Sequence, residues 1–475
     1  MAGPLRSRAR FLVCRALAAG LLACSTCTGA PVVNDVSQLN PVSVERILAP
    51  TRTEDIIAAV RAHPGPVSVG GGRYSMGGQI ATEQSLHLDM RRFDRVLRFV
   101  PSERAITVQA GITWRKIQER IDPHGLSLRV MQSYANFTVG GSLSVNAHGR
   151  YVGQGPLVST VRNIRLVLAD GRLVDASPRH NPALFYGAIG GYGGLGVIVE
   201  ATLDLTDNTA LARSSRVMPL SAYRQFFFGK IAKDANVVFH NATLDPDSYD
   251  TVRAVSFART ARPVTQPRRL VAPDADYAME HRLIRLTAEL PYGKQLRQHL
   301  IEPVWYATDL VEWRNYEASY DVRSLEPEAR TASTYVLQEY FVPVGQLEQF
   351  AARLGTILRR HDVNVLNVSI RHARKDPGTL LAWAREDVFA FVLYYRQGTG
   401  QQDRAEVGRW TRELVDAAIA LGGSHYLPYQ IHATRDQFLR AYPDAPRYFA
   451  LKRQVDPTNK FRNKLWDAYY LPQAH

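Results

Sequence analysis

Apolar residues recur along this chain with two periods, and each period predicts a different element. Alternation at every second residue predicts a half-buried strand, whereas recurrence at every third or fourth position predicts a helix. Between residues 40 and 207 the alternating runs are short and end at turn residues. They predict strands at 42–44, 66–69, 85–90, 105–111, 161–168, 172–177 and 197–205, with a hairpin turn at Asp170-Gly171.

Helices are expected in the same region after residues suited to a helix N-terminus. Thr53, Thr113 and Asn181 precede apolar periodic stretches, and their side chains can accept hydrogen bonds from free backbone N–H groups. Pro182 follows Asn181 at the first helical position, where its missing N–H is not needed. Gly125 is the expected end of the second helix.

The pattern changes at about residue 208. Longer alternating runs at 334–344 and 387–396 predict longer strands, and the stretches at 346–361 and 408–423 predict helices with one apolar face. A stretch rich in proline and arginine, 262–278, is expected to be an exposed loop. The pattern therefore predicts an α+β protein built of two layered units, without internal repeats.

The first 30 residues have the composition of an export leader. Four arginines and no acidic residue accompany an apolar run at 16–23, which is far shorter than the roughly 20 residues of a membrane span. LLAC, ending at Cys24, resembles the bacterial lipoprotein signal and predicts a lipid anchor on that cysteine. The alternatives are a secretory leader cut near Ala30, which Pro31 disfavours, and a cytosolic N-terminus. The expected localisation is a periplasmic or membrane-anchored lipoprotein, or otherwise a secreted protein.

Composition limits the chemistry of the remaining chain. All three cysteines, Cys14, Cys24 and Cys27, lie in the leader region, so the rest can form no disulfide, thiolate metal site or cysteine nucleophile. The formal net charge is +14, and removing the four leader arginines leaves +10. This scattered charge suits attraction to anionic surfaces or substrates. The sequence shows neither the clustered cations and aromatics of a nucleic-acid reader nor a metal-ligand spacing of His, Asp and Glu.

The stretch VSVGGGRYSMGG, residues 67–78, suggests close contact between backbone and ligand. Five glycines in nine residues leave N–H groups uncovered by Cβ atoms, and such a backbone can surround a pyrophosphate. A glycine-rich turn without a ligand is the alternative. GYGGLG at 191–196 matches the dinucleotide fingerprint by letter only, because a helix precedes it and a strand follows it, the reverse of the required order.

Three glycine segments together resemble one family. They are the stretch at 67–78, SYANFTVGGSLSVNAHGRY at 133–151, and GLGVIVEATL at 194–203. In order and spacing they resemble the flavin domain of the vanillyl-alcohol oxidase/p-cresol methylhydroxylase (PCMH-type) family, nearest to sugar and polyol oxidases and decaprenylphosphoryl-ribose oxidase-like proteins. The resemblance implies FAD bound by two α+β subdomains, with an antiparallel-sheet cap domain over the substrate.

The resemblance also implies boundaries and cofactor contacts. After the leader at 1–30, an FAD-binding PCMH-type domain would cover 40–207, a substrate-binding cap 208–430, and a C-terminal return to the FAD domain 431–475. The residues that the resemblance assigns to FAD binding are Gly70, Gly71, Gly72, Arg73, Tyr74, Ser75, Gly77, Thr138, Gly140, Gly141, Ser144, Asn146, Gly149, Gly196, Val197 and Ile198.

Arg73 stands where many members of this family carry a histidine that bonds covalently to the flavin. An arginine is permanently cationic and not a nucleophile, and its natural partner is phosphate. We therefore expect non-covalent FAD. His148 is the nearest histidine in the motifs, and the resemblance favours a structural or catalytic role for it.

Alcohol oxidation by a flavin needs a hydride acceptor and a base for the hydroxyl proton. The resemblance to sugar and polyol oxidases assigns active-site positions to Glu339 and Arg371, and it places Tyr429 where those enzymes have a catalytic lysine. Ser369 stands where a carboxylate often precedes the arginine by two residues, which leaves the base open. A tyrosine could serve as base or hydrogen-bond donor, but as a base it needs a lowered pKa.

Each of these residues also has a structural interpretation. Glu339 could be an ordinary edge-strand carboxylate, Arg371 an ion-pair partner of Glu386 or Asp387, and Tyr429 a core residue. Three further histidines are expected to be surface or packing residues: His372, His425 and His432.

The implied function is an FAD-dependent oxidoreductase, an oxidase or dehydrogenase acting on CH–OH groups by hydride transfer to flavin N5. Its substrate would be a small polar alcohol, a sugar, polyol or aldonolactone, and the reduced flavin would pass electrons to oxygen or a membrane electron acceptor. A flavin-binding protein with a degraded active site and a flavin reductase of the same fold are the alternatives.

Overall fold

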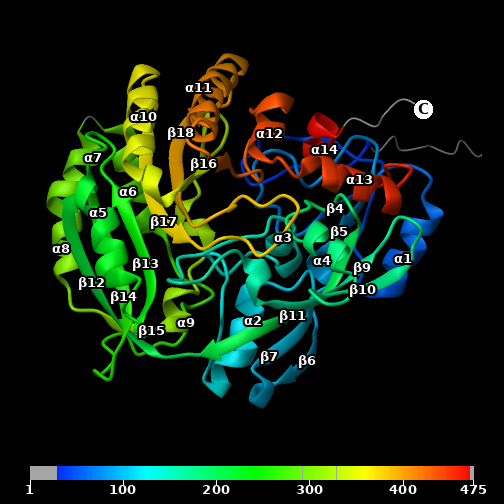
Figure 1. Ribbon diagram of the computed structural model, residues 1–475, viewed down its shortest axis with the longest axis horizontal. Helices are drawn as coiled ribbons and strands as arrows, with labels where there is room; N and C mark the ends of the chain where they lie inside the picture. The colour runs from blue at the N-terminus through cyan, green and yellow to red at the C-terminus, as the bar shows by residue number, and fades with distance from the viewer. Residues whose placement is uncertain (1–28, 291, 328, 471–475) are drawn as a thin grey trace, which may run out of the picture.

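The computed structural model describes residues 29–290, 292–327 and 329–470. Its strands form sheets of two, three, six and eight strands, with helices between and around them. In Figure 1 the molecule is elongated, with the eight-stranded sheet toward one end and the smaller sheets toward the other. The leader, including Cys24 and its predicted lipid anchor, lies outside the described residues. Among the helices that are described, none has the length and apolar character to cross a membrane.

The N-terminal elements form two small sheets. β1 and β2 pair antiparallel, and β3 and β4 flank β5 in a parallel sheet of order β3-β5-β4. The predicted helix begins at Thr53 itself, so the expectation that Thr53 is its N-cap is wrong; Arg52 holds that position without a side-chain bond. The bounds are β1 Val32–Val33, β2 Val42–Ser43, β3 Arg46–Leu48, α1 Thr53–Ala62, β4 Val67–Gly70 and β5 Leu86–Asp89.

The six-stranded sheet is antiparallel, in the order β10-β9-β11-β7-β6 with β8 beside β11. Two predicted features are confirmed: Thr113 caps α2 by accepting from Lys116 N, and Gly171 turns the β9–β10 hairpin with φ +78°. Asn181 precedes α4 as expected but makes no capping bond. The bounds are β6 Val96–Val100, β7 Ala105–Gln109, α2 Trp114–Ile121, β8 Leu126–Leu128, α3 Val139–Ser144, β9 Val161–Val167, β10 Leu173–Ala176, α4 Pro182–Ala188 and β11 Val197–Asp207.

The eight-stranded sheet is also antiparallel, in the order β15-β12-β14-β13-β17-β18-β16-β19. The larger sheets are thus those of a mixed α and β protein with antiparallel strands. The bounds are β12 Ala210–Pro219, α5 Leu220–Phe226, β13 Val237–Leu244, β14 Thr251–Arg259, α6 Ala278–Glu289, α7 Gly293–Leu296, α8 Glu302–Ala307, β15 Val311–Trp313, α9 Arg314–Glu317, β16 Ser333–Pro343, α10 Leu347–Arg360, β17 Val365–Ala373, β18 Val388–Gly398, α11 Gln401–Ile419 and β19 Ser424–His425.

Short helical turns join several of these elements. Gly125 ends one of them, η3, rather than α2 itself. Their bounds are η1 Met90–Arg92, η2 Pro101–Glu103, η3 Asp122–His124, η4 Leu157–Thr160, η5 Phe227–Ile231, η6 Arg297–Ile301, η7 Val322–Leu325 and η8 Val344–Gln346.

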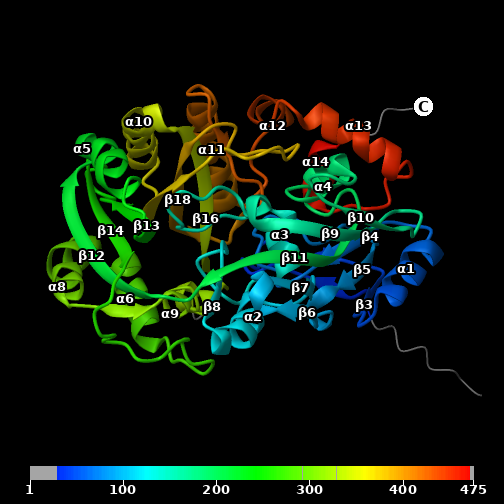
Figure 2. The ribbon, with the colours of Figure 1, turned by 60° about the horizontal axis from the view of Figure 1, so that its bottom comes forward.

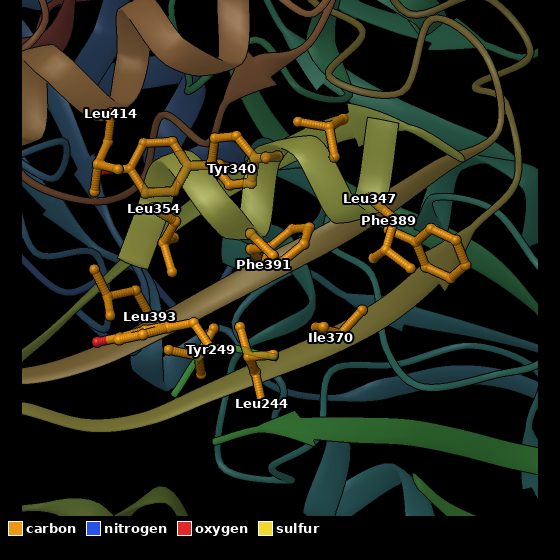
Figure 3. Close-up of a cluster of buried hydrophobic side chains, with 14 of the residues drawn as sticks. Leu244, Tyr249, Tyr340, Leu347, Leu354, Ile370, Phe389, Phe391, Leu393 and Leu414 are labelled. Atoms are coloured by element: carbon orange, nitrogen blue, oxygen red, sulfur yellow. The ribbon is translucent and has the colours of Figure 1, made fainter. Parts of the chain in front are cut away.

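Alternation along β16, β17 and β18 gives their sheet two different faces. One set of side chains, including Tyr340, Ile370 and Phe391, is fully buried against α10 and α11 (Figure 3). Leu354 of α10 and Leu414 of α11 belong to the same cluster, as the apolar stripes of those helices predict. The residues between them in sequence face the other way, toward the site.

The C-terminal stretch lies against the N-terminal elements. Val67 of β4 donates its N–H to Lys460 O, and α13 contacts α4. In both views α13 and α14 lie near β4 and α4, far from β12 (Figures 1 and 2). The bounds are α12 Arg435–Ala441, α13 Ala445–Val455 and α14 Lys464–Tyr469.

Candidate active site

A cavity of about 420 Å³ lies where the glycine segments meet the open face of the eight-stranded sheet. This volume falls within the roughly 300–1,000 Å³ of ligand and cofactor pockets. The cavity brings together residues from the first, second and third glycine segments, from β16–β18, and from the C-terminal stretch at Arg462 and Asn463. Segments far apart in sequence therefore share one binding space.

The first glycine loop begins where β4 ends. Its cavity-lining residues are Gly71, Gly72, Arg73, Tyr74 and Ser75. Gly71 is required by space, because a Cβ there would overlap Thr138 Oγ1 of the second segment. Arg73 has φ +64°, and its Nη2 donates to Asp89 at 3.1 Å.

Two glycines predicted in the first loop lie away from the cavity lining. A Cβ on Gly70 would come within 2.8 Å of the His87 ring, and one on Gly77 would collide with Tyr429 O. Both positions therefore have a local steric reason for glycine that needs no ligand.

The second segment wraps the N-terminal end of α3. Thr138, Gly140, Gly141 and Ser144 line the cavity, as does His148. Two predicted residues of this segment lie outside the cavity lining and contact other parts of the protein instead. Asn146 donates to Asp376 Oδ2 at 2.7 Å and accepts from Val158 N, and a Cβ on Gly149 would collide with Met131 O.

The third segment divides into two parts with different roles. Gly196, Val197 and Ile198, at the start of β11, line the cavity. Gly194 instead gives room for α14, since a Cβ on Gly194 would lie 2.5 Å from Trp466 Nε1. The element order, α4 before the glycines and β11 after them, agrees with our rejection of the dinucleotide fingerprint.

Polar atoms without partners show that the cavity suits a polar ligand. Arg73 Nε, Ser133 Oγ and Arg371 Nε are buried, and none has a hydrogen-bond partner among the described residues. All three residues line the cavity. Because buried polar groups are normally paired, these donors fit a large anionic ligand such as a dinucleotide, with the bare backbone of the glycine loops beside it.

The predicted catalytic residues meet on the sheet. Val392 of β18 pairs with Glu339 of β16 on one side and with Ser369 of β17 on the other, so the three side chains form a row across the sheet. The next row toward one end is Leu337, Tyr394 and Asn367, and both rows line the cavity. Position 369 carries no carboxylate, and the same row holds one two strands away, that of Glu339, roughly 10 Å across the sheet.

Glu339 joins two residues from other parts of the chain. Its Oε1 lies 2.5 Å from His148 Nε2, and its Oε2 accepts from Tyr429 OH at 3.4 Å. His148 Nδ1 lies 3.3 Å from Gly149 O, so both ring nitrogens face oxygen atoms. Glu339 and His148 are both buried, so this contact is enclosed within the protein.

Tyr429 is placed to donate a hydrogen bond rather than to act as a base. Burial, followed by the charge of Glu339, raises the pKa of its hydroxyl well above its ordinary value of 10.0. A base would need the opposite shift. The geometry therefore favours the hydrogen-bond donor of the two roles that the sequence leaves open.

Arg371 lies in the cavity, not in a remote ion pair. The ion pairs among the described residues include none between Arg371 and Glu386 or Asp387; Asp387 is instead near His372, at 3.8 Å. Burial lowers the pKa of Arg371, whereas the nearby Glu339 raises it. Its structural interpretation as a partner of Glu386 or Asp387 is wrong.

The three remaining histidines lie outside the cavity lining. Burial lowers the pKa of His372, His425 and His432 to about 4 in each case. The His372 ring contacts Phe227 at 4.8 Å and Phe389 at 5.7 Å. All three are packing residues, neutral at ordinary pH. The described residues also contain no cluster of three or more His, Cys, Asp or Glu side chains arranged to hold a metal.

Residues 44–177 match the family model of an FAD binding domain. L-gulonolactone oxidase of Mus musculus is 22% identical over 436 residues, which cover 86% of this chain and 90% of that protein. Decaprenylphosphoryl-beta-D-ribose oxidase of Mycolicibacterium smegmatis is 23% identical over 89% of this chain and 94% of its own length.

The matched domain and these relatives agree with the resemblance to the PCMH-type FAD-binding family that the glycine segments carry. Alditol oxidase of a Streptomyces species is a further relative, 37% identical over 102 residues, or 22% of this chain. FAD is accordingly the cofactor that the matched domain binds. The family model covers the first two glycine segments, and the structure adds the third and the C-terminal stretch to the same cavity.

The cavity extends into a part that sequence reasoning missed. Ile284 and Thr287 of α6, Arg297 of η6 and Val322 and Leu325 of η7 line it beyond the catalytic row. No local motif marks these residues, because α6–η7 reach the cavity only through the fold. The C-terminal contribution of Arg462 and Asn463 had a signal, since the resemblance implies a C-terminal return to the FAD domain over 431–475.

Proposed function

We propose that this protein is an FAD-dependent oxidoreductase that oxidises a CH–OH group of a polar substrate of the sugar, polyol or aldonolactone class. The observation that carries the proposal is the Glu339–His148 pair in the row with Ser369, beside Arg371 and within the cavity lined by the glycine segments. The relatives named above, oxidases of a lactone, a ribose derivative and alditols, support the substrate class.

The proposal assigns cofactor binding to the N-terminal part, as two α+β subdomains within 40–207, and substrate binding to 208–430 as a cap. The first loop with Arg73 would hold the pyrophosphate, and the second and third segments would hold the flavin through backbone and hydroxyl groups. Attachment would be non-covalent, because Arg73 occupies the position of the histidine that links FAD in many members of the family.

FAD supplies the hydride acceptor when it is bound. The substrate hydroxyl proton would pass to Glu339, whose Oε2 has one long bond, at 3.4 Å from Tyr429. His148, on the other oxygen, would stabilise the carboxylate and hold its orientation. Arg371 Nε is buried and has no hydrogen-bond partner among the described residues. It would donate to oxygen atoms of the substrate or stabilise negative charge that develops in the reaction.

Export and lipid attachment at Cys24 belong to the same proposal, since the leader composition supports them. The reduced cofactor would then be reoxidised by oxygen or by a membrane electron acceptor outside the cytoplasm.

Anaerobic reduction of the purified holoprotein tests the function. We expect an alditol or an aldonolactone to bleach the visible flavin band, and acid precipitation of the same preparation to leave FAD in the supernatant. Rapid bleaching by NADPH without any alcohol would point to a reductase instead. Bound FAD that no sugar, polyol or lactone reduces would support the degraded site, and a colourless protein that takes up no FAD would contradict the cofactor assignment.

A further inference from the structure

Exposed apolar side chains concentrate in one helical segment. Of the twelve large apolar side chains that are exposed among the described residues, eight lie between 279 and 305. They are Met279, Leu286, Leu290, Tyr292, Leu296, Leu300, Val304 and Trp305. We call these eight residues the apolar patch. α6 and α8, which carry four of the eight, lie at the end of the molecule opposite α1 in both views (Figures 1 and 2).

Helical spacing aligns the patch. Met279, Leu286 and Leu290 recur at seven and four residues along α6 and its C-cap, and Leu296, Leu300 and Val304 recur every fourth residue through η6 and α8. Residues spaced in this way share one side of a helix. Exposed fractions of 63% for Leu300, 72% for Val304 and 58% for Trp305 show that this side is uncovered. An apolar surface of this kind on a folded protein marks a place of contact.

The inner side of the same helices lines the active-site cavity. Ile284 and Thr287 of α6 and Arg297 of η6 contribute to that lining. Val322, Leu325 and Leu337 line the cavity in the same region, together with the charged Glu326 and Arg330. One helical layer therefore separates the far end of the cavity from whatever covers the patch.

Charge distinguishes between possible partners. The segment 278–307 carries four basic and three acidic residues, and one acid, Glu302, is paired inward with Arg253 and Arg297 at 3.1 Å each. The whole chain has a net charge of +14. With the Arg297–Glu302 pair set aside, three basic and two acidic residues remain in the segment. Because the protein as a whole is basic, a second copy would repel it, whereas an anionic surface would attract it.

We propose that the apolar patch docks on a lipid surface that contains anionic lipids. Aliphatic side chains flanked by Trp305 and Tyr292, with cations such as Arg282 and Lys294 nearby, have the composition of helices that lie in the membrane interface. Docking would bring the far end of the cavity close to the bilayer, which could supply a lipid-soluble electron acceptor. The docking itself is independent of the proposed reaction.

Vesicle sedimentation of the full-length holoprotein tests the docking. All proteins would carry Cys24→Ser, which removes the predicted lipidation position. We expect sedimentation with vesicles of phosphatidylglycerol and phosphatidylcholine, weaker binding to phosphatidylcholine alone, and a loss of affinity as salt is raised. The double variant Leu300→Glu/Trp305→Glu should bind about tenfold more weakly or worse. The matched control is Leu97→Glu, an exposed apolar position outside the patch, which should bind as the parent does.

A site-specific probe separates the patch from the leader. With Cys14, Cys24 and Cys27 replaced by serine, Leu300→Cys provides a single thiol for an environment-sensitive dye, and Leu97→Cys is its control. We expect a blue shift on adding anionic vesicles only for the dye at position 300. The proposal would be overturned if the double variant bound anionic vesicles as strongly as the parent, or if the parent did not bind them. It would also be overturned if the dye at position 300 showed no blue shift. So would a dimer that the double variant dissociates while vesicle binding is absent.

Discussion

The two carboxylate oxygens of Glu339 contact two different side chains. His148, on one oxygen, is placed to balance its charge, and Tyr429, on the other, donates a long hydrogen bond that a substrate hydroxyl could replace. Since burial raises the pKa of Tyr429, the proton of that phenol stays on at any ordinary pH. We therefore propose that Glu339 is the base, that His148 stabilises it, and that Tyr429 orients it by donating a hydrogen bond.

The first prediction separates the base from the donor. Glu339→Gln should lower the rate of anaerobic flavin reduction by alcohol by about a hundredfold to ten-thousandfold, the usual contribution of a general base. Tyr429→Phe removes one hydrogen bond and should cost about tenfold or less. Both variants should retain FAD. Glu200→Gln, a carboxylate paired with Arg165 outside the cavity lining, is the control and should reduce normally. If Tyr429→Phe cost as much as Glu339→Gln, tyrosine would be the base.

At the scale of elements, the same residue type meets different needs in the glycine segments. Gly71 brings the first loop against Thr138, whereas Gly194 leaves room for the rings of Tyr448 and Trp466. Lys452 of α13 reinforces the second contact by donating to Gly194 O at 2.8 Å. A motif that resembles a nucleotide fingerprint is thus in part a place where the C-terminal helices join the N-terminal sheets.

The second prediction concerns that junction. Gly194→Ala should destabilise the protein by about 1–3 kcal/mol, because its Cβ must displace two buried aromatic rings. Gly229→Ala is the matched control in η5, where no described heavy atom outside the local backbone lies within 4 Å of the new Cβ. It should be neutral or slightly stabilising, as alanine is the better helix former. Urea unfolding of both variants measures the difference, and equal midpoints for the two would contradict the steric role of Gly194.

Local patterns predict elements better than they predict how elements meet. The alternation in β16 and β18, the hairpin at Gly171 and the capping role of Thr113 follow from residues close in sequence, and all three are present. The row that joins Glu339 to Ser369 depends on register across β18, which no local signal specifies. The contribution of segment 278–307 to the cavity has a related reason: it depends on how α6 and η6 pack against the rest of the fold, which no local signal specifies.

At the scale of the whole molecule, the chain buries several ionisable side chains away from the site. Burial lowers the pKa of four histidines to about 4, namely His87, His372, His425 and His432, and that of His240 to about 3. These residues lie in both the parallel N-terminal sheet and the eight-stranded sheet or its neighbouring loops. Acid would therefore act on the fold at several places together.

The last prediction is that the free energy of unfolding decreases as the pH is lowered below about neutrality. Above the ordinary histidine value of 6.5 these five residues are neutral in both states and contribute nothing to the pH dependence. Between 6.5 and about 4 the unfolded chain binds protons that the folded protein does not, so each such histidine lowers the free energy of unfolding by up to about 1.4 kcal/mol per pH unit. Glu312 acts in the opposite direction, because burial raises its pKa to about 9 and the folded protein therefore keeps a proton that the unfolded chain releases. Its effect on the slope offsets that of one histidine. Urea unfolding at pH 7, 6 and 5 measures the slope of the free energy of unfolding against pH. His432→Gln should reduce this slope by the contribution of one proton, whereas His180→Gln, at an exposed position, should leave it unchanged. Equal stability at all three pH values would contradict the prediction and show that these histidines take up protons without unfolding.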